Sequence, residues 1–126
     1  MFSSCQAGCF SLSARGSFKE EMPLGTFNVI DQFVDRTYRR ESSFFGNGCV
    51  ARVSMAHPVS PRSRMHLTAA VEAESIPFAR TGTYLCMEDP QISTLAESLI
   101  YRAIGYSVIG MTNMPEAKLA RGTEIC

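Results

Sequence analysis

The sequence predicts an α/β fold, in which strands and helices form packed layers and the strands are at least partly parallel. Strand and helix patterns alternate over the second half of the chain, and one of these helices carries complete start and stop signals. The 126 residues suffice for one ordinary domain with a core of its own. No internal stretch is rich enough in Gly, Pro or Ser to indicate an interdomain linker.

The first half of the chain is predicted to contain two strands, a long loop and a helix. Residues 27–34 place apolar side chains on one face with a period of two, which is typical of a strand. A charged and then Ser- and Gly-bearing loop follows over residues 35–48, and a second strand is expected over 49–55. A helix is expected over residues 62–74, ending before Pro77.

The clearest helix in the sequence begins after Thr94. Two short strands, over residues 77–80 and 83–87, precede it. Thr94 and Glu97 form a capping box, and Gly105 supplies the stop. Between them, apolar residues recur at helical spacing and form one stripe: Ala96, Leu99, Ile100, Ala103 and Ile104.

The end of the chain is predicted to form a strand over residues 106–111 and then another helix. Asn113 is expected to cap this helix, with Pro115 in its first turn and an end near Arg121. Residues 124–126 read like the opening of a further element, so we expect that the chain is cut within an α/β fold.

Composition excludes several classes of function. The chain has 12 basic and 12 acidic residues, zero formal net charge and 45% apolar content. This composition argues against disorder. Zero net charge argues against binding to nucleic acid or an anionic membrane, which requires clustered Lys and Arg residues. The longest run without a charged residue, residues 1–14, is too short and too polar to span a bilayer.

Cysteine usage predicts a protein from inside the cell, with free, buried thiols. The cysteines are odd in number and include no Cys-x-x-Cys pair: Cys5, Cys9, Cys49, Cys86 and Cys126. A metal site assembled from Cys5, Cys9, His57 and His66 is an alternative, but its spacing matches no standard pattern. The serine-rich first 17 residues resemble an organelle transit peptide only weakly.

Three groups of hydroxyl residues are candidates for a binding site. Thr112 follows a predicted strand and precedes a predicted helix, a place where α/β proteins bind ligands and where helix amides suit anions. Ser93 and Glu88 occupy a second junction, and the serines near the start of the chain form a third. Plain helix capping is the alternative for each junction. Common nucleotide-binding and hydrolase motifs are absent from the sequence.

Several blocks of sequence carry a family resemblance. CMEDPQISTLAES (residues 86–98) and VIGMTNMPEAKLA (108–120) resemble the central part of 5'-methylthioadenosine phosphorylases, which belong to the purine nucleoside phosphorylase family. DQFVDRT (31–37), His57-Pro58 and SARGS (13–17) extend the similarity in the same order. Residues 1–12 are a poorly matched N-terminal segment, and residues 13–126 correspond to a partial nucleoside phosphorylase domain.

The resemblance implies a partial phosphorylase/nucleosidase-type fold, a mixed β-sheet flanked by helices and truncated at both ends. It implies phosphorolysis of a purine nucleoside, most simply of 5'-methylthioadenosine to adenine and 5-methylthioribose 1-phosphate, in purine and methionine salvage. Family members work as cytoplasmic homotrimers with inorganic phosphate as co-substrate, and without a metal or an organic cofactor. The implied partners are therefore the nucleoside, phosphate and further copies of the chain, with no nucleic acid and no membrane.

Site residues carry over by position. The phosphate-binding residues implied by the resemblance are Ser13, Ala14 and Thr112, and the substrate-binding residues are Met111, Ser93 and Ile92. The 6-oxopurine branch of the family has a glutamate at the position of Ser93, so serine favours the methylthioadenosine branch. The acid that assists the departing purine is expected beyond Cys126, so no catalytic residue is assigned within the chain.

Departures from the family pattern support a second hypothesis. Ile92 stands where the family has a phenylalanine beside the ribose, Arg52 replaces a histidine that reaches a neighbouring subunit, and Asp89 replaces a glycine. Family members are about twice this length, and we expect the isolated chain to be inactive because general acid catalysis is worth roughly 10² to 10⁴ in rate. The alternative function is an inactive remnant that serves as an oligomerisation or interaction module.

Overall fold

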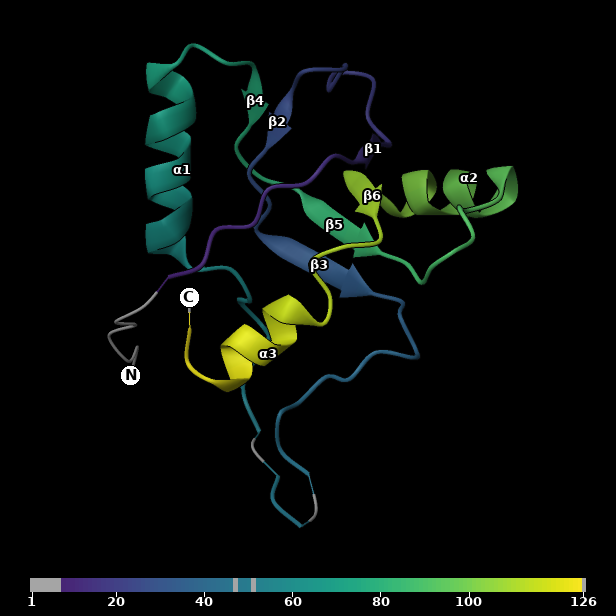
Figure 1. Ribbon diagram of the computed structural model, residues 1–126. Coiled ribbons are helices and arrows are strands. Elements are labelled where there is room, and N and C mark those ends of the chain that lie inside the picture. The colour runs from purple at the N-terminus through teal and green to yellow at the C-terminus, as the bar shows by residue number, and fades with distance from the viewer. Residues whose placement is uncertain (1–7, 47, 51, 126) are drawn as a thin grey trace.

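The computed structural model describes residues 8–46, 48–50 and 52–125. Its centre is a four-stranded mixed sheet with the order β1-β6-β5-β3, formed by β1 (Gly16–Ser17), β6 (Val108–Gly110), β5 (Thr83–Cys86) and β3 (Gln32–Asp35) (Figure 1). β3, β5 and β6 are parallel, whereas β1 runs antiparallel to β6. Helices flank this sheet, so the expected α/β class with a mixed sheet is confirmed.

The single strand expected over residues 27–34 is wrong, because the chain changes sheets within it. β2 (Phe27–Asn28) pairs in parallel with β4 (Phe78–Ala79) in a second, two-stranded sheet, and β3 then enters the main sheet. Between the two strands, Asp31 exchanges hydrogen bonds with Gly82: its amide donates to the Gly82 carbonyl and its carboxylate accepts from the Gly82 amide. A period of two describes both strands equally well, so it does not reveal the change of partner.

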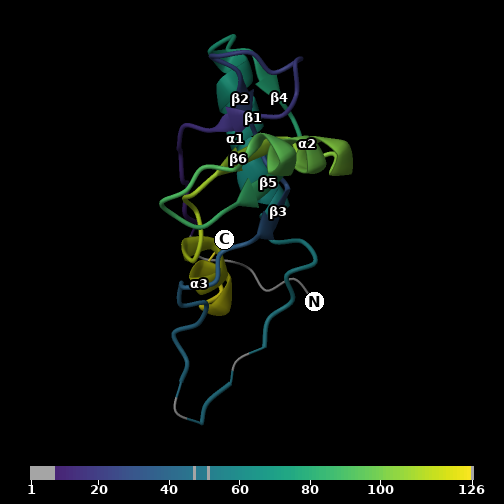
Figure 2. The same ribbon diagram turned by 90° about the vertical axis from the view of Figure 1, so that its right-hand side faces the viewer.

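The strand expected over residues 49–55 is also wrong. Its described residues form neither helix nor strand, and Val50 and Val53 are 78% and 42% exposed. The preceding loop is confirmed for residues 36–46. Figure 2 shows the chain between β3 and α1 as a long excursion away from the sheet. Among the described residues none of 49–55 pairs with a strand of either sheet, and β propensity without a partner strand does not form a strand.

Of the three helices in the described part of the chain, two lie where the sequence predicts them. α1 (Pro61–Ala73) begins after the N-cap Ser60, and α2 (Leu95–Ile104) has both hydrogen bonds of the Thr94 capping box and ends at Gly105, whose φ is 96°. α3 (Glu116–Gly122) begins later than expected, and Pro115 at its N-cap makes no side-chain cap. None of the helices among the described residues is both long enough and apolar enough to cross a membrane.

The expected capping role of Asn113 is wrong. Asn113 has a φ of 72°, and its side-chain carbonyl accepts a hydrogen bond from Ser11 instead of capping α3. Because the short α3 starts three residues further on, Thr112 does not sit directly against helix-terminal amides. The physical basis for an anion site at this junction must therefore come from side chains.

The core is concentrated on β5. Tyr84, Leu85 and Cys86 are fully buried, and Val108 and Met114 pack around this strand. By contrast, the apolar stripe of α2 is mostly exposed: Leu99, Ile100 and Ile104 are 57%, 56% and 60% accessible, and Tyr101 is the buried residue of this helix. Periodicity predicted the helix correctly, but in the described part of the chain nothing covers its apolar face.

The expectation of buried thiols holds for one cysteine. Cys86 is buried in β5, whereas Cys9 and Cys49 are exposed free thiols, so the expectation is wrong for those two. Cys5 and Cys126 lie outside the described residues. Cys86 alone is part of a strand at the centre of the sheet, and strand pairing there explains its burial.

Candidate functional site

A pair of hydroxyl groups lies just before β1 begins and just after β6 ends. The antiparallel register places Gly16 opposite Ile109, and extending this register by three residues brings Ser13 opposite Thr112. The Ser13 Oγ and Thr112 Oγ1 atoms are 2.9 Å apart although the residues are 99 positions apart in sequence. Ser11 donates to the side-chain carbonyl of Asn113 at 3.0 Å and extends the contact between the two segments.

A guanidinium group completes this cluster. Arg15 Nη1 lies 3.4 Å from Thr112 Oγ1, and the Arg15 Cζ lies 4.2 Å from the centroid of the Tyr84 ring. The Tyr84 hydroxyl donates to the Thr112 carbonyl at 2.6 Å. Burial raises the pKa of Tyr84 to about 12, so the hydroxyl remains a donor at neutral pH. We call Ser13, Arg15, Tyr84 and Thr112 the β6-end cluster.

Arg40 binds the backbone on either side of Thr112. It comes from the long loop after β3, and its Nη1 donates to the carbonyls of Met111 and Met114 at 2.6 and 2.5 Å. Its Nε donates to Glu88 at 2.9 Å and its Nη2 donates to Asp89 at 2.9 Å. One guanidinium thereby ties the loop, the end of β5 and the turn that carries Thr112 into one unit.

Glu88 is held as a carboxylate by this arrangement. Its Oε2 accepts from the backbone amides of Tyr38 and Arg39 at 2.8 and 2.9 Å. These backbone hydrogen bonds, assisted by Arg40, lower the pKa of Glu88 to about 2. Sequence reasoning placed Glu88 only at a helix entry and missed Arg40. The available signal was the charged run within a long loop, close in sequence to the DQFVDRT block.

A second ion pair fixes α3 to the sheet. Lys118 pairs with the Asp35 carboxylate, which also accepts from the Thr37 amide at 2.8 Å. Burial raises the pKa of Asp35, but the hydrogen bonds from Lys118 and Thr37 outweigh burial, and the pKa lies below its usual value. The segments on both sides of Thr112 are thus anchored to the last residue of β3 and to the loop that follows it.

The other predicted site residues lie apart from the hydroxyl pair or contribute only backbone. Ser93 shares a hydrogen bond with Ser98, their Oγ atoms 2.9 Å apart, and Ile92 is 80% exposed. Ala14 is exposed and accepts a 3.3 Å hydrogen bond from Ser13 through its carbonyl. Met111 is half-buried, with its carbonyl bound by Arg40. The hydrogen bonds of the described residues bring Ser13 and Thr112 together but do not connect Ser93 or Ile92 to them.

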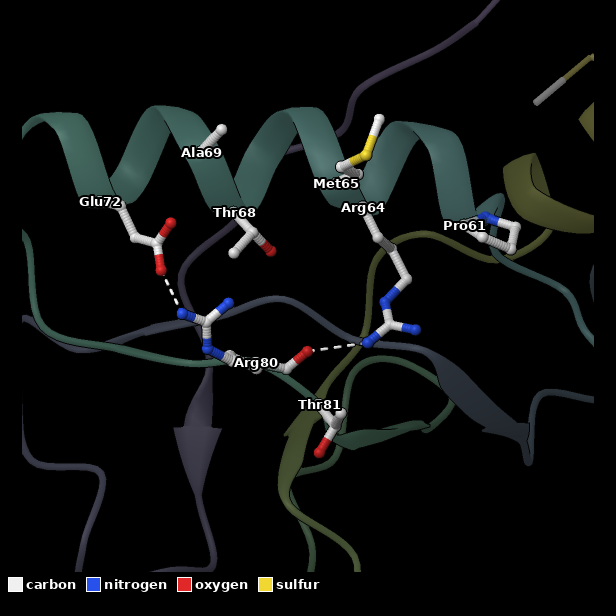
Figure 3. Close-up of a pocket in the computed structure, with 8 residues that line it drawn as sticks. All are labelled: Pro61, Arg64, Met65, Thr68, Ala69, Glu72, Arg80 and Thr81. Atoms are coloured by element: carbon white, nitrogen blue, oxygen red, sulfur yellow. Dashed lines mark hydrogen bonds and ion pairs between the residues drawn. The ribbon is translucent and has the colours of Figure 1, made fainter.

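An open groove of about 510 Å³ lies beside α1, and it contains none of the predicted site residues (Figure 3). Its two guanidinium groups already face acidic side chains: Arg80 pairs with Glu72, and Arg64 lies 3.7 Å from the Asp31 carboxylate. Arg64 also donates to the Arg80 carbonyl at 2.8 Å. With its charges paired, the groove is a weaker candidate for an anion than the β6-end cluster.

The described residues offer no group of three or more His, Cys, Asp or Glu side chains that could hold a metal ion. The metal alternative built on Cys5 lies in part outside the described residues. The chemistry of the β6-end cluster is instead that of hydroxyl and guanidinium donors, which suit an oxyanion.

Fold and cluster together define an α/β protein with a candidate oxyanion site at the carboxyl ends of parallel strands. A family model described as the phosphorylase superfamily matches residues 10–126. Because this match covers most of the chain, the chain belongs to the phosphorylase superfamily.

Curated relatives narrow the similarity. The chain is 76% identical over 116 residues to the S-methyl-5'-thioadenosine phosphorylase of Bradyrhizobium diazoefficiens, a match covering 92% of this chain and 40% of the relative. It is 61% identical over 115 residues to the same-named protein of Rhodospirillum rubrum, covering 91% and 39%. The chain therefore spans about 40% of the length of these relatives.

Solved structures show the same fold. The methylthioadenosine phosphorylase of Schistosoma mansoni in its ligand-free form superposes with a TM-score of 0.80 at 30% identity, over 84% of this chain and 45% of that one. A variant of the adenosine/methylthioadenosine phosphorylase of the same organism, in complex with adenine, gives a TM-score of 0.81 over 86% and 46%. The expected resemblance to methylthioadenosine phosphorylases is confirmed.

Proposed function

We propose that this chain contributes to the phosphorolysis of 5'-methylthioadenosine, which yields adenine and 5-methylthioribose 1-phosphate. The observation that carries the proposal is the Ser13–Thr112 hydroxyl pair at the strand ends, in a chain 76% identical to a relative named for this substrate. Two hydroxyl donors on one spot suit the oxygens of inorganic phosphate, the co-substrate of such a reaction.

In this proposal, phosphate attacks the anomeric carbon of the sugar while the purine leaves, through an oxocarbenium-like transition state. Ser13, Ala14 and Thr112 hold the phosphate, and Met111 lies against the ribose. Ser93 and Ile92 contribute to the substrate pocket. Holding phosphate in line with the anomeric carbon lowers the barrier by orientation, and no metal or organic cofactor takes part. No residue of this chain is assigned the role of general acid toward the purine.

We propose a cytoplasmic homotrimer acting in purine and methionine salvage as the setting of this activity. The exposed apolar residues on α2 support an assembly, because contiguous apolar surface is the kind that oligomers cover. Size-exclusion chromatography with light scattering measures the mass of the assembly. A single monomeric species across the concentration range contradicts the trimer without touching the proposed reaction.

A second candidate function is an inactive remnant that acts as an interaction module. Ile92 favours it, because this side chain is 80% exposed at a position predicted to line the substrate pocket. Loss of an aromatic wall at that position removes contact area from the ligand. The chain spans about 40% of the length of this curated relative. The two candidates therefore have to be compared in a complete protein, where the question is whether these residues still support catalysis.

A chimera separates the two candidates. Residues 10–125 replace the matching segment of the Bradyrhizobium relative, and release of adenine from 5'-methylthioadenosine is measured with and without inorganic phosphate. We expect phosphate-dependent activity within about tenfold of the parent, because roughly one kcal/mol of altered contacts changes a rate about fivefold. The matched control is the same chimera with Thr112→Val, which loses the hydroxyl. A folded chimera without activity supports the remnant.

A further inference from the structure

The hydroxyl pair alone lacks the charge that a phosphate dianion favours. Ser13 and Thr112 are neutral, and the whole chain has zero formal net charge. Arg40 is also close to the site, but its three guanidinium nitrogens already donate to Glu88, Asp89 and two backbone carbonyls. Arg40 therefore holds the turn in place and leaves little net positive charge for a ligand.

Arg15 differs from Arg40 in its pairing. Its hydrogen bond to Thr112 Oγ1 is long at 3.4 Å, and among the described residues no carboxylate lies within ion-pairing distance of Arg15. The guanidinium keeps most of its five N–H donors for another partner. Its Nη1 lies beside the Thr112 hydroxyl, which in turn lies 2.9 Å from the Ser13 hydroxyl.

The strands beneath Arg15 are shaped to hold it there. The fully buried Tyr84 offers its ring face at 4.2 Å, and the Tyr84 hydroxyl is fixed on the Thr112 carbonyl. Stacking on an aromatic face orients a guanidinium without neutralising it. Gly110 leaves the space for this approach, because a Cβ there would lie 2.8 Å from the Tyr84 hydroxyl and 3.1 Å from Arg15 Nη1.

We propose that Arg15 is a phosphate-binding residue, which adds a positive charge to the oxyanion site formed with Ser13 and Thr112. This inference rests on the proposed function and adds a ligand that the family resemblance does not assign. When phosphate binds, Arg15 exchanges its long hydrogen bond to Thr112 for charge-assisted hydrogen bonds to phosphate oxygens, and the Tyr84 ring keeps the guanidinium in place.

The test is a titration of the full 126-residue chain with inorganic phosphate. Binding is monitored through the NMR chemical shifts of the Ser13 and Thr112 amides, and sodium chloride at matched ionic strength is the blank. Arg15→Gln removes the charge and is expected to weaken binding roughly 10- to 100-fold, the usual effect of losing a hydrogen bond to a charged group. Arg15→Lys keeps the charge without the planar fork and is expected to lose less. Arg62→Gln, at an exposed arginine of α1, makes the same change in net charge and is the matched control.

Each outcome decides a distinct point. If phosphate binds the wild type and Arg15→Gln with equal affinity, the role of Arg15 is overturned and the proposed function still stands. Absence of any phosphate-dependent shift at Ser13 and Thr112 overturns the role of Arg15 in this chain, whereas the activity of the chimera decides the proposed function. If circular dichroism shows that Arg15→Gln is unfolded, the salt dependence of the wild type decides, because a charge-assisted contact near the surface weakens as salt rises. An affinity that does not change with salt overturns the inference.

Discussion

The β6-end cluster and the outer face of α2 make an instructive contrast. Both arise from clear sequence patterns, a strand followed by hydroxyl residues and an apolar helical stripe. The first joins three segments of the chain through the hydrogen bonds of Ser13 and Tyr84 to Thr112, and Arg40 binds the neighbouring Met111 carbonyl. The second leaves Leu99, Ile100 and Ile104 largely accessible to water. The difference shows that a sequence pattern predicts the local helix or strand. How many tertiary contacts that element makes depends on which distant segments pack against it.

Removal of Arg40 should break the tied region most strongly. The Arg40 side chain is 17% exposed and its partner Glu88 12%. Arg40→Met leaves the Met111 and Met114 carbonyls and the Glu88 carboxylate without this donor, which we expect to lower the free energy of unfolding by about 2 to 4 kcal/mol. Urea unfolding monitored by circular dichroism measures the loss. Arg39→Met, at the exposed neighbouring arginine, is the control, and equal losses in the two variants contradict the special role of Arg40.

Acid should weaken the same region through Glu88. The pKa of Glu88 is lowered to about 2 in the folded chain from an ordinary value of 4.5. The stabilisation is therefore complete above pH 4.5 and is lost progressively as the pH falls from 4.5 toward 2. Glu88→Gln should flatten the dependence of unfolding free energy on pH in this window. Glu116→Gln, at an exposed residue of α3, is the comparison, and identical profiles for both variants speak against the assignment.

The helix caps give a smaller and more local test. The Thr94 hydroxyl accepts a hydrogen bond from the Glu97 amide at 3.2 Å, and the Glu97 carboxylate accepts one from the Thr94 amide at 2.7 Å. Thr94→Ala should cost about 1 kcal/mol. Ser60→Ala at α1, where a single 3.4 Å hydrogen bond is made, should cost less, about 0.5 kcal/mol. Thermal unfolding compares the two, and a larger loss at Ser60 reverses the expected order.

The smallest effect on the folded monomer is expected on the bare face of α2. Leu99→Gln changes a side chain that is 57% exposed, so the free energy of unfolding should move by less than about 0.5 kcal/mol. The same variant should reduce self-association measured by light scattering if copies of the chain meet on this face. A stability loss above about 2 kcal/mol shows that Leu99 is covered, which removes the contrast between the two regions.

Prediction of the elements succeeded where the signals were local. The capping box of Thr94 and the stop at Gly105 gave α2, because caps act over three or four residues. Expectations failed where pairing decides. Residues 27–34 divide between two sheets, and the described residues of 49–55 pair with no strand. A strand pattern states which side chains share a face but not which strand lies beside them.

The candidate site shows the same division. Ser13 and Thr112 were each identified from the sequence, Ser13 through the resemblance and Thr112 also as a strand-end hydroxyl. Their separation of 2.9 Å follows from the antiparallel pairing of β1 with β6. Arg15 and Arg40 were missed because an arginine in a loop or beside a short strand carries no local signal of its partner. Which arginine is neutralised and which is open depends on carboxylates that come from elsewhere in the chain.

The sequence by itself determined the α/β class, the helix α2 with its caps, the phosphorylase family and the hydroxyl residues of the candidate site. These rest on neighbours a few residues apart or on ordered blocks of residue identity. Only the tertiary structure decided that β2 and β3 belong to different sheets, that Asn113 turns away from α3, and that Arg15 lies on Tyr84 beside Thr112. These outcomes depend on contacts between distant segments, whose energies are set when the strands pair.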